Sequence, residues 1–423
     1  MILLFLQIVF RFIHLKLGMR LTSLILYVGI SNGLFQTNLS SQVSQTAQKL
    51  TLPQIIDSAM ISHPLLKNSR LNITMAKVRS EKNIDIKPTE FLFRKGQLYS
   101  TFQSTDFEIK QNFGSPASWI EKYKLSKRLV ELEEAQTWLK EKEVIYSIKL
   151  AYYNSVFQYR KMILLSKQKL ALETLKPDSI FRFRPIDSVL LETILAENKF
   201  AEMESKADEA YNDWLIANNN LVQAAFLNTE TEPSDTDLIM VTIAPPRDTN
   251  MRAPANLFLD LFRKQKEVSS ENVKIEKLKF FPEVYFGYFV QTINKSSSFT
   301  GWQAGLSLPI WYFSQNSNLK EKQIEKQMAE NEFEYHQSEI AANTANLITG
   351  MNKLFERLNY FYDFGLRQAD NIESTANNEY KTHFISLDKY IESINTAYQI
   401  RMDYLETINN YNQKALELEV YTY

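Results

Sequence analysis

Residues 283–310 read EVYFGYFVQTINKSSSFTGWQAGLSLPI, and this stretch decides the fold. Its first half carries an alternating apolar series, with the two-residue period of a β-strand: Val284, Phe286, Tyr288 and Val290. A polar Lys-Ser-Ser-Ser turn follows at 295–298. A second alternating series then runs back through Trp302, Ala304, Leu306, Leu308 and Ile310. The pattern predicts a β-hairpin over residues 283–312, with strands of about ten residues.

A second window of the same kind lies at residues 89–115. Apolar residues alternate with polar ones on either side of a polar turn at 100–106: Phe91, Phe93, Phe107, Ile109 and Phe113. The strand at 108–113 precedes the strand at 305–310 by 197 positions, and Glu192 precedes Glu392 by 200. A near-constant offset indicates one fold unit that is present twice.

Long helices connect the two windows. No glycine occurs between Gly114 and Gly287, although glycine is the residue that most often interrupts a helix after proline. From Ser118 to about Leu175 apolar residues recur at four-three spacing, as in a coiled coil. The members are Leu125, Leu129, Leu132, Leu139, Tyr146, Leu150, Tyr153, Phe157 and Leu164. A helix of that length is a rod of about 90 Å.

Prolines and polar segments divide the chain further. We predict an export segment and spacer (1–46), a first repeat (47–227), a linker (228–253) and a second repeat (254–423). Each repeat contains a helix, a hairpin, a long helix, a polar tip and a last helix. The first helix is expected to run from Thr51 to Lys87, and the tips are expected at 176–187 and 380–388.

The N-terminus has the pattern of an export signal. Met19-Arg20 provides a positive start, and residues 21–30 form an apolar stretch of signal-peptide length, so either Met1 or Met19 can be the first residue. A membrane anchor over residues 1–33 is the competing interpretation. Lysine plus arginine (48) nearly balances aspartate plus glutamate (49), which argues against a nucleic-acid partner. The chain has no cysteine, which excludes disulfides and thiolate metal sites.

The hairpins restrict the possible architectures. Strands of about ten residues with aromatic faces suit an outer membrane, but four strands cannot close a barrel, and open edges are not tolerated in lipid. If the hairpins span a membrane, several chains must combine, and three copies would supply twelve strands. The alternative is a water-exposed four-stranded sheet that caps a helical bundle.

Over residues 50–423 the chain resembles TolC-type outer-membrane efflux channels. The segments that carry the resemblance are 52–59 (LPQIIDSA), 62–66 (SHPLL), 88–91 with 96–97 (PTEF, GQ), 111–116 (QNFGSP), 281–282 (FP), 301–311 (GWQAGLSLPIW) and 411–419 (YNQKALELE). Several of them look like the branch that accompanies heavy-metal resistance-nodulation-division (RND) pumps, so metal cations are one class of cargo that the resemblance implies.

The resemblance implies a mainly α fold with a small β part. Duplicated long-helix hairpins would form an α-barrel in the periplasm, and four strands per protomer would join a trimeric 12-stranded transmembrane β-barrel. The implied partners are two further copies of the chain, a periplasmic adaptor, an inner-membrane RND transporter and outer-membrane lipid. No cofactor is implied.

In the resembling family the helical tips close the channel and dock the adaptor. The family's second tip has glycine and an acidic residue where this chain has His383 and Phe384, and that glycine supplies a left-handed turn. The expected docking residues are His383, Phe384, Ile385 and Ser386 in the second tip and Pro185 and Ile186 in the first.

We expect the second tip to carry a gate as well. Asp388 matches the family's tip aspartate, and Glu392 lies one helical turn further on. Repeated around a threefold axis, these carboxylates would form a ring that attracts cations. Three charged residues of the first tip complete the predicted gate: Arg182, Arg184 and Asp187. The alternative is that all of these are solvated tip charges.

The sequence lacks the signatures of common catalytic sites. Its four histidines are scattered, and no HExxH, Walker A, GxSxG or Rossmann motif is present. His336 is expected on a helix surface. The sequence therefore predicts no enzyme, and the resemblance implies a passive exit duct of a tripartite efflux pump. The alternative function is a structural or adhesive coiled-coil protein of the cell envelope that forms no pore.

Overall fold

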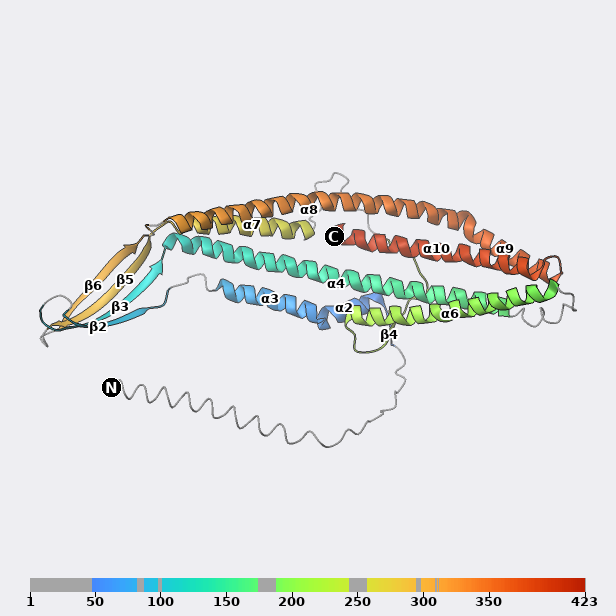
Figure 1. Cartoon of the computed structure of the whole chain (residues 1–423), viewed down its shortest axis with the longest axis horizontal. Coiled ribbons are helices and arrows are strands. Elements are labelled where there is room, and N and C mark those ends of the chain that lie inside the picture. Colours follow the sequence, from blue (N-terminus) through green and yellow to red (C-terminus); the bar gives the residue numbers. More distant parts are fainter. Residues whose placement is uncertain are drawn as a thin grey trace, which may run out of the picture. The chain divides into compact units, whose positions relative to one another are not determined.

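A computed structural model describes residues 48–81, 87–97, 101–173, 188–242, 257–293, 298–308, 310 and 312–422. The predicted export segment (1–46) and first tip (176–187) lie outside these residues. Ala47–Tyr423 forms one compact unit, which is mostly helical and carries a small sheet at one end (Figure 1). Among the described residues, no helix combines the length and the apolar character that crossing a membrane would require.

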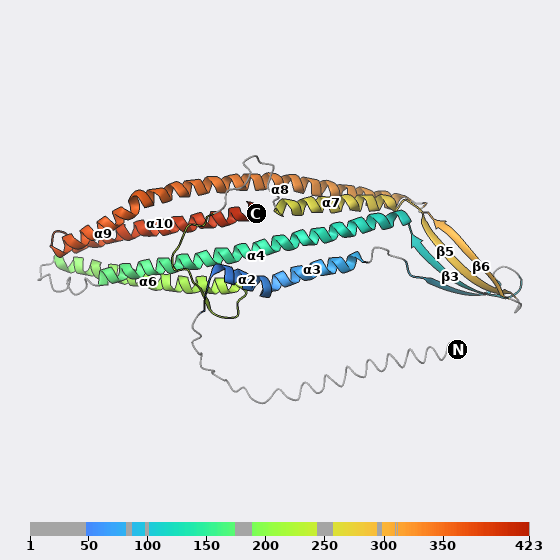
Figure 2. The ribbon, with the colours of Figure 1, turned by 180° about the vertical axis from the view of Figure 1, so that it is seen from behind.

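Long helices lie side by side and form four rods in the described part of the chain (Figures 1 and 2). The first rod consists of α2 (Leu52–Ser62), α3 (Pro64–Ser80) and α6 (Ser188–Ala225), and the second is α4 (Pro116–Glu173). The third consists of α7 (Leu257–Leu278) followed by α10 (Leu387–Thr422). The fourth consists of α8 (Phe313–Tyr360), the π-helix η1 (Phe361–Gly365) and α9 (Leu366–Lys381).

The core lies between these rods. Its middle part gathers around three fully buried residues of α4, Ile148, Tyr152 and Val156, which contact residues from α2, α6, α8 and α10. A second cluster near the tip joins Leu172 of α4 to the last turns of α9 and the first turns of α10. The four-three spacing predicted for the long helices therefore serves packing between helices of one chain.

The sheet contains β2 (Glu90–Gly96), β3 (Ser104–Gly114), β5 (Glu283–Ile293) and β6 (Ser298–Ser307). The strands are antiparallel in the order β2-β3-β5-β6, so the two predicted hairpins join along β3 and β5. Strands β2 and β6 are the edges of the sheet. Two hairpins 170 or more residues apart in sequence thus form one sheet, which no local pattern could specify.

Two predicted boundaries are wrong, and one predicted strand is irregular. The first helix is interrupted at His63, which caps the N-terminus of α3, and α3 ends at Ser80, well before Lys87. The return strand β6 ends at Ser307, so Leu308 and Ile310 lie outside it; Pro309 between them has no N–H to donate to a sheet. The register shifts between Asn112 and Gly114, so Phe113 sits in an irregularity of β3 and has no cross-strand partner in its register.

The predicted linker has structure of its own. Within it β4 (Thr231–Pro233) pairs in parallel with β1 (Gln48–Leu50). Further along, the side chain of Asn412 on α10 accepts the N–H of Val241 and donates to the carbonyl of Ile239, both at 2.8 Å. Residues 228–242 therefore cover one face of the helix layer, whereas 243–256 lie outside the described residues.

Two further details differ from expectation. The fourth rod contains a π-helical turn at Phe361–Gly365, whereas its counterpart α4 is an unbroken helix of 58 residues. His336 is not simply a surface residue, because its ring stacks on Phe262 of α7 with ring centroids 3.8 Å apart. Its Nδ1 also lies 2.8 Å from the carboxylate of Glu339.

Candidate functional site

The sheet has two chemically distinct faces. Cross-strand register places Phe93, Phe107, Val290 and Thr300 in one row, and large apolar side chains of this face are exposed. These are Phe91, Phe93, Phe107, Phe286, Tyr288, Trp302 and Leu306. An exposed apolar area of this extent requires a partner, since a monomer in water seldom leaves one uncovered.

The opposite face carries a charge network. Arg94 on β2 donates to Asp106 at 2.6 Å and to Glu108 at 2.7 Å, and both carboxylates lie on β3. Gln303 on β6 donates to the other oxygen of Glu108. Asp106 and Glu108 are buried, so their charges are stabilised by these hydrogen bonds instead of by bulk water. The network ties three of the four strands together.

Glycines of the polar face make room for aromatic rings. Gly301 and Gly305 on β6 are paired with Phe289 and Tyr285 on β5. A Cβ atom at Gly301 would lie 2.5 Å from the Phe289 ring, which real contacts do not allow. Glycine is therefore required because the partner's ring lies across it. This explains the glycines at positions 301 and 305.

The second tip is a tight connection between α9 and α10. His383 has φ of 63°, in the left-handed region, at the position where the resembling family has glycine. The N–H groups of His383 and Phe384 donate to carbonyls of the last turn of α9, as in a common helix C-cap. Ser386 then accepts the N–H of Lys389 at the start of α10, at 3.4 Å.

The tip presents some of the predicted docking residues and buries others. Phe384 is 83% exposed, the largest exposure among the apolar residues described, whereas Ile385 packs against the tip core. Asp388 and Glu392 are exposed on α10. Glu392 pairs with Lys389 at 2.8 Å, and this hydrogen bond raises the pKa of Lys389. Arg182, Arg184, Pro185, Ile186 and Asp187 lie outside the described residues.

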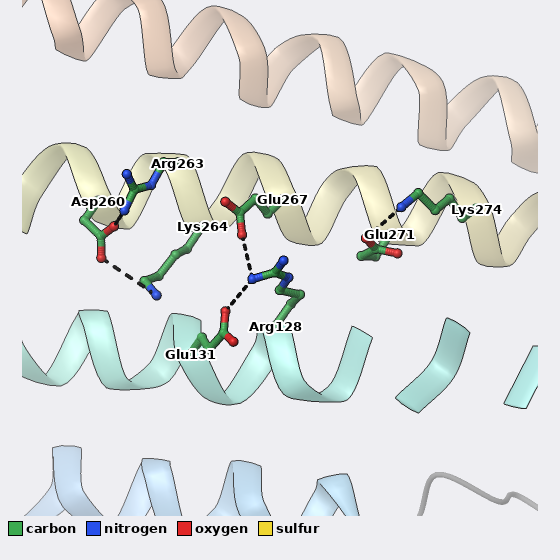
Figure 3. Close-up of polar contacts among 8 residues, drawn as sticks. All are labelled: Arg128, Glu131, Asp260, Arg263, Lys264, Glu267, Glu271 and Lys274. Atoms are coloured by element: carbon green, nitrogen blue, oxygen red, sulfur yellow. Dashed lines mark hydrogen bonds and ion pairs between the residues drawn. The ribbon is translucent and has the colours of Figure 1, made fainter. Parts of the chain in front are cut away.

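A polar seam joins α4 to α7 in the half of the layer next to the sheet (Figure 3). Arg128 on α4 contacts Glu131 at 2.8 Å and reaches Glu267 on α7 at 3.1 Å. Hydrogen bonding to Glu131 raises the pKa of Arg128. On α7 Lys274 also pairs with Glu271 at 2.9 Å. Charge pairs thus accompany the buried apolar residues of α7, such as Val268 and Val273, and such exposed pairs contribute little to the stability of the fold.

Among the described residues, no three His, Asp or Glu side chains lie together as metal ligands would. The sequence analysis identified the hairpins and the second tip. It missed the Arg94 network, although Ser104, Asp106 and Glu108 alternate with the apolar residues of β3. It also did not predict that His383 itself adopts the left-handed conformation, and it did not predict the π-helical turn.

Paired long helices that end in a small two-faced antiparallel sheet define the fold class of the chain: mainly α with a small β part. No protein-family model matches the chain, and no curated protein matches it in sequence. Solved structures do match, and all those described below are of outer membrane channels.

The Campylobacter jejuni CmeC outer membrane channel matches with a TM-score of 0.69 and 11% identity, over 88% of this chain and 85% of that one. The open state of the Neisseria gonorrhoeae MtrE outer membrane channel gives 0.70 and 13%, over 88% of each chain. CusC, solved in a study of transmembrane channel formation, gives 0.69 and 12%, over 89% and 94%. The mainly α fold with a small β part that the TolC-type resemblance implies is thus confirmed for the single chain.

Proposed function

We propose that the chain is the outer-membrane channel component of a tripartite efflux system. In this role it is a passive exit duct for substrates that an inner-membrane RND transporter and a periplasmic adaptor deliver. The observation that carries the proposal is the sheet: one face is apolar and exposed, the other is polar and charged, and both edges are unpaired within the described residues. Such a sheet is suited to lipid on one side and water on the other.

Assembly into a homotrimer follows from the open edges. If β2 of one protomer pairs with β6 of the next, three copies close a 12-stranded barrel without exposed backbone groups. The helical layer ends in complementary edges as well. On the side of α3 away from α4, an exposed stripe contains Leu71, Met75 and Val78; on the side of α8 away from α7, another contains Ile324, Met328 and Tyr335.

Charges beside these two stripes are complementary. Helix α3 contains no acidic residue. Two of its cations, Arg70 and Lys77, pair with carboxylates of α4, and the other two, Lys67 and Arg79, are exposed next to the stripe. Helix α8 exposes three acidic residues along the stripe, Glu321, Glu332 and Glu334, and one cation, Lys320. Apolar seams flanked by opposite charges are the usual way in which helices choose a partner, so α3 of one protomer would pack on α8 of the next and form the α-barrel.

A planar-bilayer recording of the purified protein tests the proposal. We expect discrete, stable conductance steps, together with a detergent-resistant, heat-labile trimer in outer-membrane fractions. Protein heated until the trimer dissociates is the control and should give no steps. A monomer that stays in solution without detergent and gives no conductance would instead support the structural or adhesive coiled-coil protein.

The tips would hold the gate and the adaptor surface. Asp388 and Glu392, with Arg182, Arg184 and Asp187 of the first tip, would surround the closed end, and the residues at 383–386 and 185–186 would meet the adaptor. Conductance of Asp388→Ala channels should rise and their block by multivalent cations should weaken. Glu356→Ala, an exposed change on α8, is the control. Equal conductance and equal block in Asp388→Ala would remove the gate.

Metal cations as cargo are supported by the resemblance to the heavy-metal branch. The channel would need no resident metal site for that cargo, because a duct passes its substrates without holding them. Transport of a metal salt by cells that carry the channel with its pump, compared with cells that lack the channel, tests this part separately.

A further inference from the structure

A groove of about 690 Å³ runs along the helix layer between α4, α8 and α10. Its lining combines an apolar floor with a charged rim. The floor is Tyr146, Leu150 and Leu354, and the rim is Lys353, Arg357, Lys414 and Glu417. The rim therefore carries three cationic side chains and one carboxylate. The groove is remote from the tip and the sheet, and neither the fold nor the proposed gate requires this charge.

Two of the three cations have no carboxylate to pair with. Arg357 contacts Asp403 at 3.4 Å. For Lys353 and Lys414 no carboxylate lies within ion-pair distance in the part of the chain that the structure describes. Lys353 is exposed and Lys414 is half-buried, so an anion that enters the groove would be attracted to both positive charges.

A glycine in the middle of α8 sets the position of Lys414. Gly350 lies inside a helix of 48 residues, where glycine costs roughly 1 kcal/mol against alanine. A Cβ atom there would lie 3.1 Å from Cε and 3.3 Å from Nζ of Lys414. The side chain of Lys414 therefore passes over Gly350, and the missing methyl group lets it lie close against α8.

The groove opens on the face of the layer opposite the linker. Asn412 binds linker residues 239 and 241, whereas Asn410, Gln413 and Glu417 are exposed. Positions 410 and 417 lie on the other side of α10 from 412, because successive helical residues are about 100° apart. Three copies of the linker would obstruct a tube if they faced inward, so in the proposed duct the linkers face outward and the grooves face the lumen.

We propose that this groove binds organic anions that have an apolar body, as a selectivity site on the wall of the duct. The apolar floor receives the hydrocarbon or ring part, and Lys353 and Lys414 receive the anionic group. A lumenal location rests on the proposed function. The threefold arrangement would repeat the site around the channel and raise the local concentration of such anions.

The test measures binding and conduction separately. Purified full-length protein in neutral detergent is titrated with naphthalene-2-sulfonate, with the neutral naphthalene-2-sulfonamide and with naphthalen-2-ylmethylammonium, by calorimetry. We expect the sulfonate to bind at least about tenfold more tightly than the other two. Lys353→Gln with Lys414→Gln should remove that preference. Lys277→Gln with Lys320→Gln, which changes two exposed lysines outside the groove, is the matched control and should keep it.

Gly350→Ala gives a second, charge-neutral test. It should weaken sulfonate binding several-fold because Lys414 must move, and leave thermal stability equal or higher because alanine favours the helix. Equal binding of the three naphthalene probes, or an unchanged preference in the double lysine variant, would overturn the site. If the preference follows the lysines but bilayers show no conductance, the groove stands and the proposed function fails.

Discussion

The two longest rods occupy equivalent places in the repeats but differ in regularity. Helix α4 of the first repeat continues unbroken for 58 residues, whereas its counterpart in the second repeat changes from α8 to the π-helix η1 and then to α9. Helix α4 packs against rods on both sides, whereas the main packing partners of α8 in the described residues are α7 and α10. The long helices of the two repeats thus differ in structure, because α4 lies inside the helix layer and α8 lies at its edge.

The edge position explains the differences. Ile148, Tyr152 and Val156 of α4 are almost completely buried. A π-helical turn in α4 would rotate the residues that follow it about the helix axis and move such side chains out of the core. On α8 one side packs inward and the stripe at Ile324, Met328 and Tyr335 is uncovered. A π-helical turn can be accommodated there, and it brings Phe361 into the core while Tyr362 remains exposed. Such turns are often found at functional positions.

The largest expected effect separates the interior rod from the edge rod. Ile148→Ala should lower the free energy of unfolding by about 2–5 kcal/mol, since it removes fully buried methyl groups and leaves a cavity. Ile324→Ala on the stripe of α8 should cost less than about 1 kcal/mol in the dissociated chain. Thermal unfolding of both variants checks the comparison, and equal losses would contradict it.

The next effect concerns assembly. Met328→Lys places a cation in the α8 stripe, opposite the basic α3 of the proposed neighbour, and should weaken trimer formation by about tenfold or more. Met328→Leu keeps the apolar surface and is the control. Light scattering of dilute protein in detergent measures the oligomer. A trimer of unchanged strength in Met328→Lys would show that the stripe does not face another protomer.

The π-helical turn should be sensitive to one methyl group. A Cβ atom at Gly365 would lie 2.9 Å from the ring of Phe361, so Gly365→Ala should destabilise the chain by about 1–3 kcal/mol through overpacking. At Gly350, in the regular part of α8, alanine should stabilise by up to about 1 kcal/mol. Melting temperatures that move in the same direction in both variants would refute this contrast.

The smallest effect is a pH dependence at the break in the first rod. His63 is buried, and its Nδ1 accepts the N–H of Leu65 at 3.3 Å. Burial lowers the pKa of His63 below its ordinary value of 6.5, hydrogen bonding to the Ala224 backbone opposes this, and Lys140 lowers it further. Glu143, also beside this site, is paired with Lys140. The neutral ring is therefore the form that the fold needs.

The sign follows from proton uptake. Because the pKa of His63 is lower in the folded chain, the unfolded chain binds more protons as the pH falls below about 6.5, and the free energy of unfolding decreases. His63→Asn retains a capping oxygen that does not titrate and should reduce the loss by about 1 kcal/mol. Unfolding at about pH 7.5 and about pH 5 measures it. Identical acid sensitivity in the two proteins would contradict the assignment.

Much of the fold could be predicted because its signals are local. Alternation marked all four strands of the sheet, and four-three spacing marked α4 to within two residues of its observed ends. The break at His63 was missed because the sequence patterns before and after it are compatible with one continuous helix. The Arg94 network was missed because its members lie on three strands, β2, β3 and β6. The sequence around each member does not indicate which residues of the other strands it contacts.

By itself the sequence determined the duplication, the strand and helix periods and the positions of the turns, since side-chain alternation and backbone conformation are properties of neighbouring residues. Only the tertiary structure decided which copy lies inside the layer, where the π-helical turn falls, that His383 adopts a left-handed backbone and that Lys414 passes over Gly350. These features depend on which surfaces pack together across long sequence separations. A local sequence pattern predicts which side of a helix or strand is apolar, but it does not predict the element against which that side packs.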